Sequence, residues 1–282
     1  MTIKAAVIGD PISHSLSPKI HGYFLDKYKI DGSYQAIKIE KNNLNQDVKK
    51  LIDEGFAGFN VTLPHKEEIY KLCHHKSRSA ELTGAVNTVI ITADGKLFGH
   101  NSDVEGFLNN LKISCPEFDL KGKNAFVIGA GGAARAIVYG LIKSGVSKIF
   151  ITNRNQERAE KLITDFLYFS HQKRCEIIFL DEKKFAPKLE LCDLLVNSTS
   201  LGMTGQEKLR LDLNHLNKSA VVYDIVYKPL ITDLLADAKK RGNKIVTGIG
   251  MLVQQALIGF EAWFGKKPEV DEQLEKILTN NL

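Results

Sequence analysis

Residues 124–136 read NAFVIGAGGAARA, and this stretch predicts the fold of the second half of the chain. Asn124 to Ile128 form a nearly continuous apolar run, typical of a buried parallel strand. The run breaks into Gly129-Ala130-Gly131-Gly132 and continues as an alanine-rich segment to about Ser144, which predicts a helix. A glycine turn in this context favours a dinucleotide site, because the backbone approaches the pyrophosphate and the helix start offers free N–H groups. The alternative is a turn that only packs a strand on a helix.

Strands and helices alternate on both sides of this turn. In the second half, further strands are predicted at 148–152, 175–180, 194–197 and 220–225, and helices at 157–169 and 231–241. In the first half, strands are predicted at 3–9, 33–39 and 59–63, a hairpin at 85–91 and 96–99, and helices at 18–28, at 43–54 and from Lys66. Val253, Ala256, Phe260 and Trp263 mark the apolar face of a last helix that Gly265 ends. The alternation predicts an α/β protein whose second half is a parallel, doubly wound sheet.

Length and composition narrow the class of protein. The chain has 282 residues, which suits two domains, and its 44% hydrophobic and 25% charged residues indicate a folded globular protein. A net charge of +5 is too small to argue for nucleic acid, and no run approaches the roughly 20 apolar residues of a membrane helix. Four widely spaced cysteines indicate neither a disulfide framework nor a zinc site. We therefore expect a cytoplasmic protein without a bound metal.

The residues at the end of the strand predicted at 148–152 indicate which dinucleotide binds. An NAD site usually carries an acid there, whereas this chain has Thr152-Asn153-Arg154-Asn155, with Arg158 one turn later. Two guanidinium groups suit the 2′-phosphate of NADP(H). The alternative is that both arginines are solvated surface residues.

Polar side chains cluster in the loops of the first hundred residues. They are Ser15, Ser17, Asn60, Thr62, Lys66, Asn87, Asn101, Ser102 and Asp103. Such side chains at neighbouring strand ends converge on one crevice and suit a small polyhydroxylated acid. Taken singly, each is more often a turn residue or a helix cap.

An ordered set of motifs resembles the shikimate dehydrogenase family over nearly the whole chain. The motifs are residues 13–18 (SHSLSP), 59–66 (FNVTLPHK), 85–88 (AVNT), 99–103 (GHNSD), 129–136 (GAGGAARA), 153–154 (NR), 197–203 (NSTSLGM), 223–224 (YD) and 250–253 (GMLV) with Gln255. The resemblance implies a substrate-binding α/β domain (1–103 with 251–282), an NADP-binding Rossmann-like domain (104–250) and a cleft between them. It also implies a monomer or homodimer.

The resemblance assigns roles to individual residues. It places Ser15 and Ser17, with Tyr227 nearby, at the substrate carboxylate. It places the substrate hydroxyls and the reacting oxygen at Thr62, Lys66, Asn87, Asp103 and Gln255. It places NADP(H) at Gly129, Ala130, Gly131, Gly132, Ala133, Ala134, Asn153, Arg154, Arg158, Thr199, Ile225, Gly248 and Met251. Asn155 and Ser102 depart from the family pattern, which more often has threonine at both positions.

The reaction implied by the resemblance is the reversible reduction of 3-dehydroshikimate to shikimate by NADPH. Our hypothesis is that Lys66 is the general acid and base and that Asp103 orients its ammonium. The alternative for Lys66 is a binding cation with water as the proton donor. The alternative functions are a quinate/shikimate enzyme of dual specificity, a non-catalytic NADP(H)-binding regulator, and another Rossmann enzyme such as a folate dehydrogenase. His14 and His65 are interpreted as supporting or surface residues.

Overall fold

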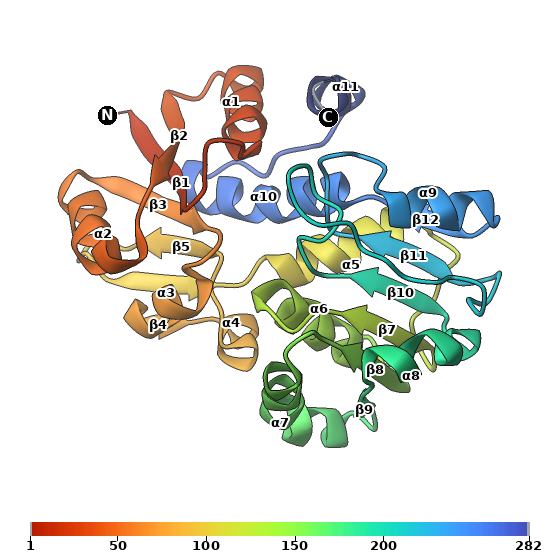
Figure 1. The fold of residues 1–282 in the computed structure, drawn as a ribbon. Coiled ribbons are helices and arrows are strands. Elements are labelled where there is room, and N and C mark those ends of the chain that lie inside the picture. Colours follow the sequence, from red (N-terminus) through yellow and green to blue (C-terminus); the bar gives the residue numbers. More distant parts are fainter. Residues whose placement is uncertain (1, 281–282) are drawn as a thin grey trace. The chain divides into compact units, whose positions relative to one another are not determined.

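The computed structural model describes residues 2–280 and divides into two compact units (Figure 1). Unit 1 comprises residues 2–106 and 252–280, and unit 2 comprises residues 107–251. These borders lie close to the ones expected after residues 103 and 250. The chain is α/β in both units, as the alternating pattern predicts.

Unit 1 contains a mixed six-stranded sheet in the order β2-β1-β3-β5-β6-β4. Its strands are β1 (Ile3–Gly9), β2 (Gly32–Lys38), β3 (Phe56–Val61), β4 (His75–Lys76), β5 (Thr88–Ile91) and β6 (Leu97–His100). β1 pairs in parallel with β2 and β3, whereas β5 is antiparallel to both β3 and β6. The predicted hairpin is therefore confirmed, and Gly95 takes the positive φ of 76° that its turn requires.

Most helices of unit 1 come after a strand in the chain, whereas the last one comes after another helix. They are α1 (Ser17–Tyr28), α2 (Leu44–Asp53), α3 (Lys66–Leu72), α4 (Arg78–Thr83) and α11 (Glu272–Thr279), with a 3₁₀ turn at Lys41–Asn43. Two further helices pass from one unit to the other along the chain: α5 (Asp103–Ser114) begins in unit 1, and α10 (Gly248–Phe264) begins in unit 2. No helix within residues 2–280 is both long and apolar enough to span a membrane.

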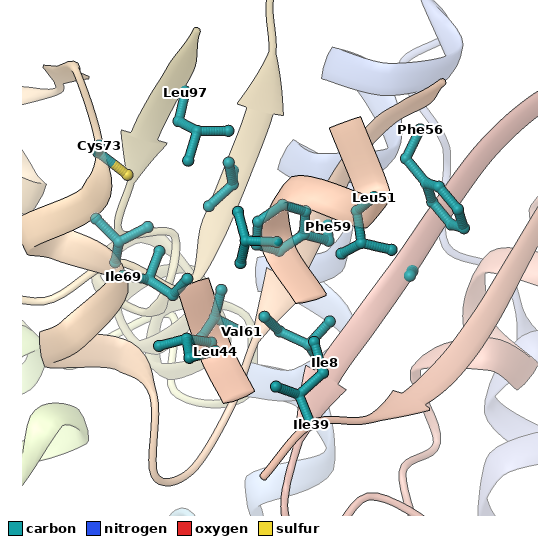
Figure 2. Packing of buried hydrophobic residues seen from close by; sticks show 14 of the residues in the cluster. Ile8, Ile39, Leu44, Leu51, Phe56, Phe59, Val61, Ile69, Cys73 and Leu97 are labelled. Atoms are coloured by element: carbon teal, nitrogen blue, oxygen red, sulfur yellow. The ribbon is translucent and has the colours of Figure 1, made fainter. Parts of the chain in front are cut away.

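Strand β3 divides its side chains between the two faces of the unit 1 sheet. Phe59 and Val61 pack into a core that includes Leu44 and Leu51 of α2 (Figure 2). After the register shift that follows Phe56, the alternate positions Gly58 and Asn60 point to the other face. There, a Cβ atom on Gly58 would lie only 2.2 Å from the indole Nε1 of Trp263, which donates a hydrogen bond to the carbonyl of Val89 (2.9 Å). Only glycine allows α10 to approach the sheet this closely.

Unit 2 contains a sheet of six parallel strands in the order β12-β11-β10-β7-β8-β9. Its strands are β7 (Asn124–Ile128), β8 (Lys148–Thr152), β9 (Glu176–Phe179), β10 (Leu194–Asn197), β11 (Val221–Asp224) and β12 (Lys244–Val246). Its helices are α6 (Gly132–Lys143), α7 (Gln156–Gln172), α8 (Glu182–Phe185) and α9 (Asp233–Lys240), with a 3₁₀ turn at Ala186–Leu191. The predicted doubly wound sheet is confirmed.

Several local expectations were wrong or incomplete. β3 begins at Phe56 rather than at residue 59, because Gly58 is accommodated within the strand under Trp263. Helix α2 begins at Leu44, and Asn43, where the helix was expected to begin, ends a 3₁₀ turn. The helices α4, α5, α8 and α11 and the short strands β4 and β12 were not predicted.

Candidate active site

Lys66 and Asp103 form a largely buried ion pair in unit 1. Lys66 is the first residue of α3 and Asp103 is the first residue of α5, so each follows the end of a strand segment. Only 15% of the lysine side chain and 9% of the aspartate side chain are exposed. The other carboxylate oxygen, Oδ1, accepts a hydrogen bond from Asn87 Nδ2 at 2.7 Å. The ammonium therefore has a fixed counter-ion, and the counter-ion is itself held by an amide.

Asn87 joins this pair to Gln255 through Ser102. Its Oδ1 accepts from the backbone N–H of Ser102 at 2.8 Å, which orients the amide nitrogen towards Asp103. The Ser102 hydroxyl also lies 3.3 Å from Oε1 of Gln255, whose amide nitrogen donates to the carbonyl of Leu252 (3.0 Å). The structure thus brings Lys66, Asp103, Asn87 and Gln255 into one network. Ser102, which departs from the family pattern, links the two side-chain amides, because its N–H donates to Asn87 and its hydroxyl donates to Gln255.

The loop that carries Ser15 and Ser17 (residues 13–18, the serine loop) is connected to the same network through Tyr34. Ser17 is buried, and its backbone N–H donates to Oγ of Ser15 at 3.3 Å. Tyr34 hydrogen-bonds Ser17, and its hydroxyl donates to Oδ1 of Asn60 (2.6 Å). Asn60 in turn donates to the carbonyl of Asn87 at 3.1 Å. Burial raises the pKa of Tyr34 well above its usual range, so it is a neutral hydrogen-bonding group.

Thr62, His65 and His14 have three different environments in unit 1. Thr62 directly follows β3, and its methyl group fills the space beside Gly9. His65 is fully buried, and its Nε2 lies 2.7 Å from the carbonyl of Ile39, so it supports the fold and is not a surface residue. His14 is exposed.

Sequence reasoning missed Tyr34 and the buried His21. The rings of His21 and Tyr34 stack with centroids 3.9 Å apart. His21 lies four residues after Ser17, hence on the same face of α1, and this spacing was the signal available. Burial lowers the pKa of His21 to about 3, whereas Asn60 acts to raise it, so the ring is neutral at physiological pH.

The glycine turn of unit 2 has the geometry of an anion site. Gly129 has a φ of +113°, and a Cβ atom there would lie 2.6 Å from Oγ of Ser198. A Cβ atom on Gly131 would meet no atom within 4 Å. Helix α6 then begins at Gly132. Its N-cap residue is Gly131, which has no side chain that could cap the first N–H groups of the helix. The open helix start with Ala130, Ala133 and Ala134 around it fits a bound phosphate.

The end of β8 carries the two predicted arginines at the surface. Arg154 and Arg158 are exposed, and Arg158 lies in the first turn of α7. Asn153 donates to the carbonyl of Asn155 (2.7 Å), and the side chain of Asn155 accepts from the N–H of Arg158 (2.9 Å). Asn155 is therefore the N-cap of α7, and this departure from the family pattern has a structural role.

The remaining predicted cofactor residues also belong to unit 2. Thr199 Oγ1 donates to Oδ1 of Asn197 at 2.7 Å. Gly248 packs on the backbone of Ile225, where a Cβ atom would lie 2.1 Å from the carbonyl oxygen. Met251 is buried at the start of α10. Tyr227, which was expected near the substrate carboxylate and not at the cofactor, is half-buried in the loop after β11, and burial raises its pKa.

Two chemical capacities follow from these residues. In unit 1, an ammonium held against a carboxylate, among amides and hydroxyls, suits binding of a polyhydroxylated molecule and proton transfer to one of its oxygens. In unit 2, an open helix start and two surface guanidinium groups suit a phosphorylated dinucleotide. Within residues 2–280, no three histidine, cysteine, aspartate or glutamate side chains gather as metal ligands.

Comparisons with known proteins point to one family. Residues 7–89 match the profile of the shikimate dehydrogenase substrate binding domain. Residues 112–227 match the shikimate / quinate 5-dehydrogenase profile, and residues 248–275 match the shikimate 5′-dehydrogenase C-terminal domain.

Individual relatives match over nearly the whole chain. Shikimate dehydrogenase (NADP(+)) of Paramagnetospirillum magneticum is 48% identical over 270 residues, covering 96% of this chain and 95% of the relative. The structure of shikimate 5-dehydrogenase from Thermus thermophilus in complex with NADP(H) and shikimate aligns with a TM-score of 0.85 at 34% identity, over 99% of both chains. Quinate dehydrogenase from Corynebacterium glutamicum in complex with NAD aligns with a TM-score of 0.89 at 28% identity, over 99% of both chains.

Proposed function

Because the chain belongs to the shikimate dehydrogenase family, we propose that it catalyses the reversible, NADP(H)-dependent reduction of 3-dehydroshikimate to shikimate. The observation that carries this proposal is the Lys66–Asp103 ion pair within one hydrogen-bond network with Asn87 and Gln255. A reaction that creates a hydroxyl group from a carbonyl needs one proton at the oxygen. This network offers a single ammonium to supply it.

The residues of unit 1 would bind the substrate and move the proton. Lys66 Nζ donates to the carbonyl oxygen, stabilises the negative charge that develops there, and transfers its proton as the hydroxyl forms. In the reverse direction the neutral amine accepts the proton. Asp103 holds the ammonium in place and accepts a hydrogen bond from a neighbouring substrate hydroxyl.

The other polar groups would orient the ring. Asn87 and Gln255 each keep one amide hydrogen beyond the bonds described above, which suits a substrate hydroxyl. Thr62 adds a hydroxyl at the end of β3. Ser15 and Ser17, with Tyr227 of unit 2, would bind the carboxylate through their hydroxyl groups.

The residues of unit 2 would bind NADP(H), which supplies the hydride when bound. The start of α6 binds the pyrophosphate. Arg154 and Arg158 bind the 2′-phosphate, with Asn153 beside it. Thr199, Ile225, Gly248 and Met251 line the remainder of the cofactor.

The test is the absorbance of the reduced nicotinamide, with shikimate or quinate crossed against NADP or NAD. Fast reduction with shikimate and NADP, and much slower reduction in the other three combinations, is expected. Comparable rates with quinate or NAD would assign the chain to a dual-specificity enzyme. NADPH binding without turnover in any combination would refute the enzymatic proposal and leave a regulator that binds the cofactor.

A further inference from the structure

Asp224 is a buried carboxylate for which the mechanism above has no use. It is the last residue of β11, and none of its surface is exposed. Its Oδ1 accepts hydrogen bonds from Nδ2 of Asn197 (2.9 Å) and from the backbone N–H of Val226 (3.0 Å). Its Oδ2 accepts from the hydroxyl of Thr232 (2.7 Å). All three donors are neutral groups.

Two of the three donors, Asn197 and Val226, lie within two residues of a predicted cofactor residue. The third donor, Thr232, lies at the start of the helix that follows the loop after β11. Asn197 is the register partner of Asp224 on β10, and its amide oxygen, turned away from Asp224, accepts both the N–H and the hydroxyl of Thr199. Val226 follows Ile225, on whose carbonyl Gly248 packs. Thr232 is the N-cap of α9, where its oxygen accepts from an N–H at 3.4 Å. One carboxylate therefore sets the mutual position of three segments at the carboxyl edge of the sheet.

A carboxylate at this position is not explained by stability. Burial raises the pKa of Asp224 to about 6, although Thr232, Val226 and Asn197 act to lower it. Loss of hydration thus outweighs the three hydrogen bonds. An apolar side chain would avoid this cost, but it would leave three donors from three different segments without their common acceptor.

We propose that Asp224 is a positioning residue for cofactor binding, which holds residues 197–201, 225–226 and Thr232 in the arrangement where Thr199 and Ile225 contact NADP(H). This inference rests on the proposed function. Asp224 acts through Asn197 and Val226 and does not touch the ligand.

Asp224→Ala and Asp224→Asn separate positioning from charge. Alanine removes the acceptor. An amide keeps most of the geometry, since its oxygen can accept from Asn197 and Val226 while its NH₂ donates to Thr232, whose hydroxyl reverses its role. We expect Asp224→Ala to raise the Kd of NADPH about tenfold and Asp224→Asn to raise it less than threefold, both measured by nicotinamide fluorescence. The KM for NADP should rise in parallel, while kcat at saturating NADP changes less than threefold.

The control is Asp237→Ala, which removes an exposed carboxylate of α9 that pairs with Lys240. Its Kd should equal that of the wild type. An unchanged Kd for folded Asp224→Ala would overturn the inference, as would equal losses in the alanine and asparagine variants. A wild type that neither binds NADPH nor turns over would instead refute the proposed function.

A second pair of variants applies if Asp224→Ala does not fold. Thr232→Val removes the donor to Oδ2, and Thr232→Ser keeps it. A raised Kd in the valine variant with a wild-type Kd in the serine variant would support the inference. Wild-type values in both variants would overturn it.

Discussion

Replacement of Lys66 by alanine should separate its catalytic role from its contribution to stability. A positioned general acid contributes about 10² to 10⁴ in rate, equivalent to about 3 to 5 kcal/mol of activation free energy. We expect Lys66→Ala to lower kcat within this range. The KM for shikimate should rise less than tenfold, because Asn87, Gln255 and the serine hydroxyls remain.

The same substitution leaves Asp103 without its cation. Breaking a fully buried ion pair costs about 3 to 5 kcal/mol. Here the expected loss in unfolding free energy is about 2 kcal/mol, because Lys66 is 15% exposed and Asp103 keeps its hydrogen bond from Asn87. Adding Asp103→Asn should recover most of this loss, since the new amide oxygen still accepts from Asn87 and no charge remains buried.

Two assays on the same proteins test this reasoning. Denaturant unfolding gives the free energies, and steady-state reduction of NADP gives kcat and KM. The double variant should regain stability without regaining turnover. A kcat for Lys66→Ala equal to that of the wild type, with only KM raised, would refute the acid–base role and leave a binding cation.

Three further predictions follow from unit 2. Arg154→Ser should raise the KM for NADP about 10- to 100-fold, which corresponds to the loss of one charge-assisted hydrogen bond, and should leave the KM for NAD unchanged. The control is Lys161→Ser, on the exposed side of α7, and equal losses with both cofactors in Arg154→Ser would contradict the assignment. Gly131→Ala should weaken NADPH binding at least tenfold without changing the melting temperature, because the new methyl group enters only the predicted phosphate space. Gly129→Ala should in addition lower the unfolding free energy by about 2 kcal/mol, because residue 129 has a positive φ. Tight NADPH binding by Gly131→Ala would place the pyrophosphate elsewhere. Asp224 binds its proton more tightly in the folded protein than in the unfolded chain, so its contribution to the unfolding free energy should fall by about 2 kcal/mol as the pH rises from 4 to 7. The difference in unfolding free energy between wild type and Asp224→Asn should show this trend, and a difference independent of pH would contradict the raised pKa.

Local patterns predicted the elements whose signals are strong along the chain. The strands at Ile3–Gly9, Asn124–Ile128 and Leu194–Asn197 were identified with these bounds, because buried strands are apolar runs that turns interrupt. Helix α5 was missed, since Gly106, Asn109 and Asn110 have low helix propensity. Tertiary contacts offset this propensity: the Asn110 amide donates to the Tyr223 hydroxyl (2.6 Å) and to the carbonyl of Thr247 (3.0 Å).

By itself, the sequence determined the glycine turn after a buried strand, the arginines in place of an acid, and the set of polar residues proposed to bind the substrate. These are properties of neighbouring residues, which a linear pattern records. Only the tertiary structure decided that Asn87 points its nitrogen at Asp103, that Tyr34 links the serine loop to Asn60, and that Asp224 is buried among three neutral donors. Hydrogen-bond direction and loss of hydration depend on groups that are distant in sequence, and folding alone brings those groups together.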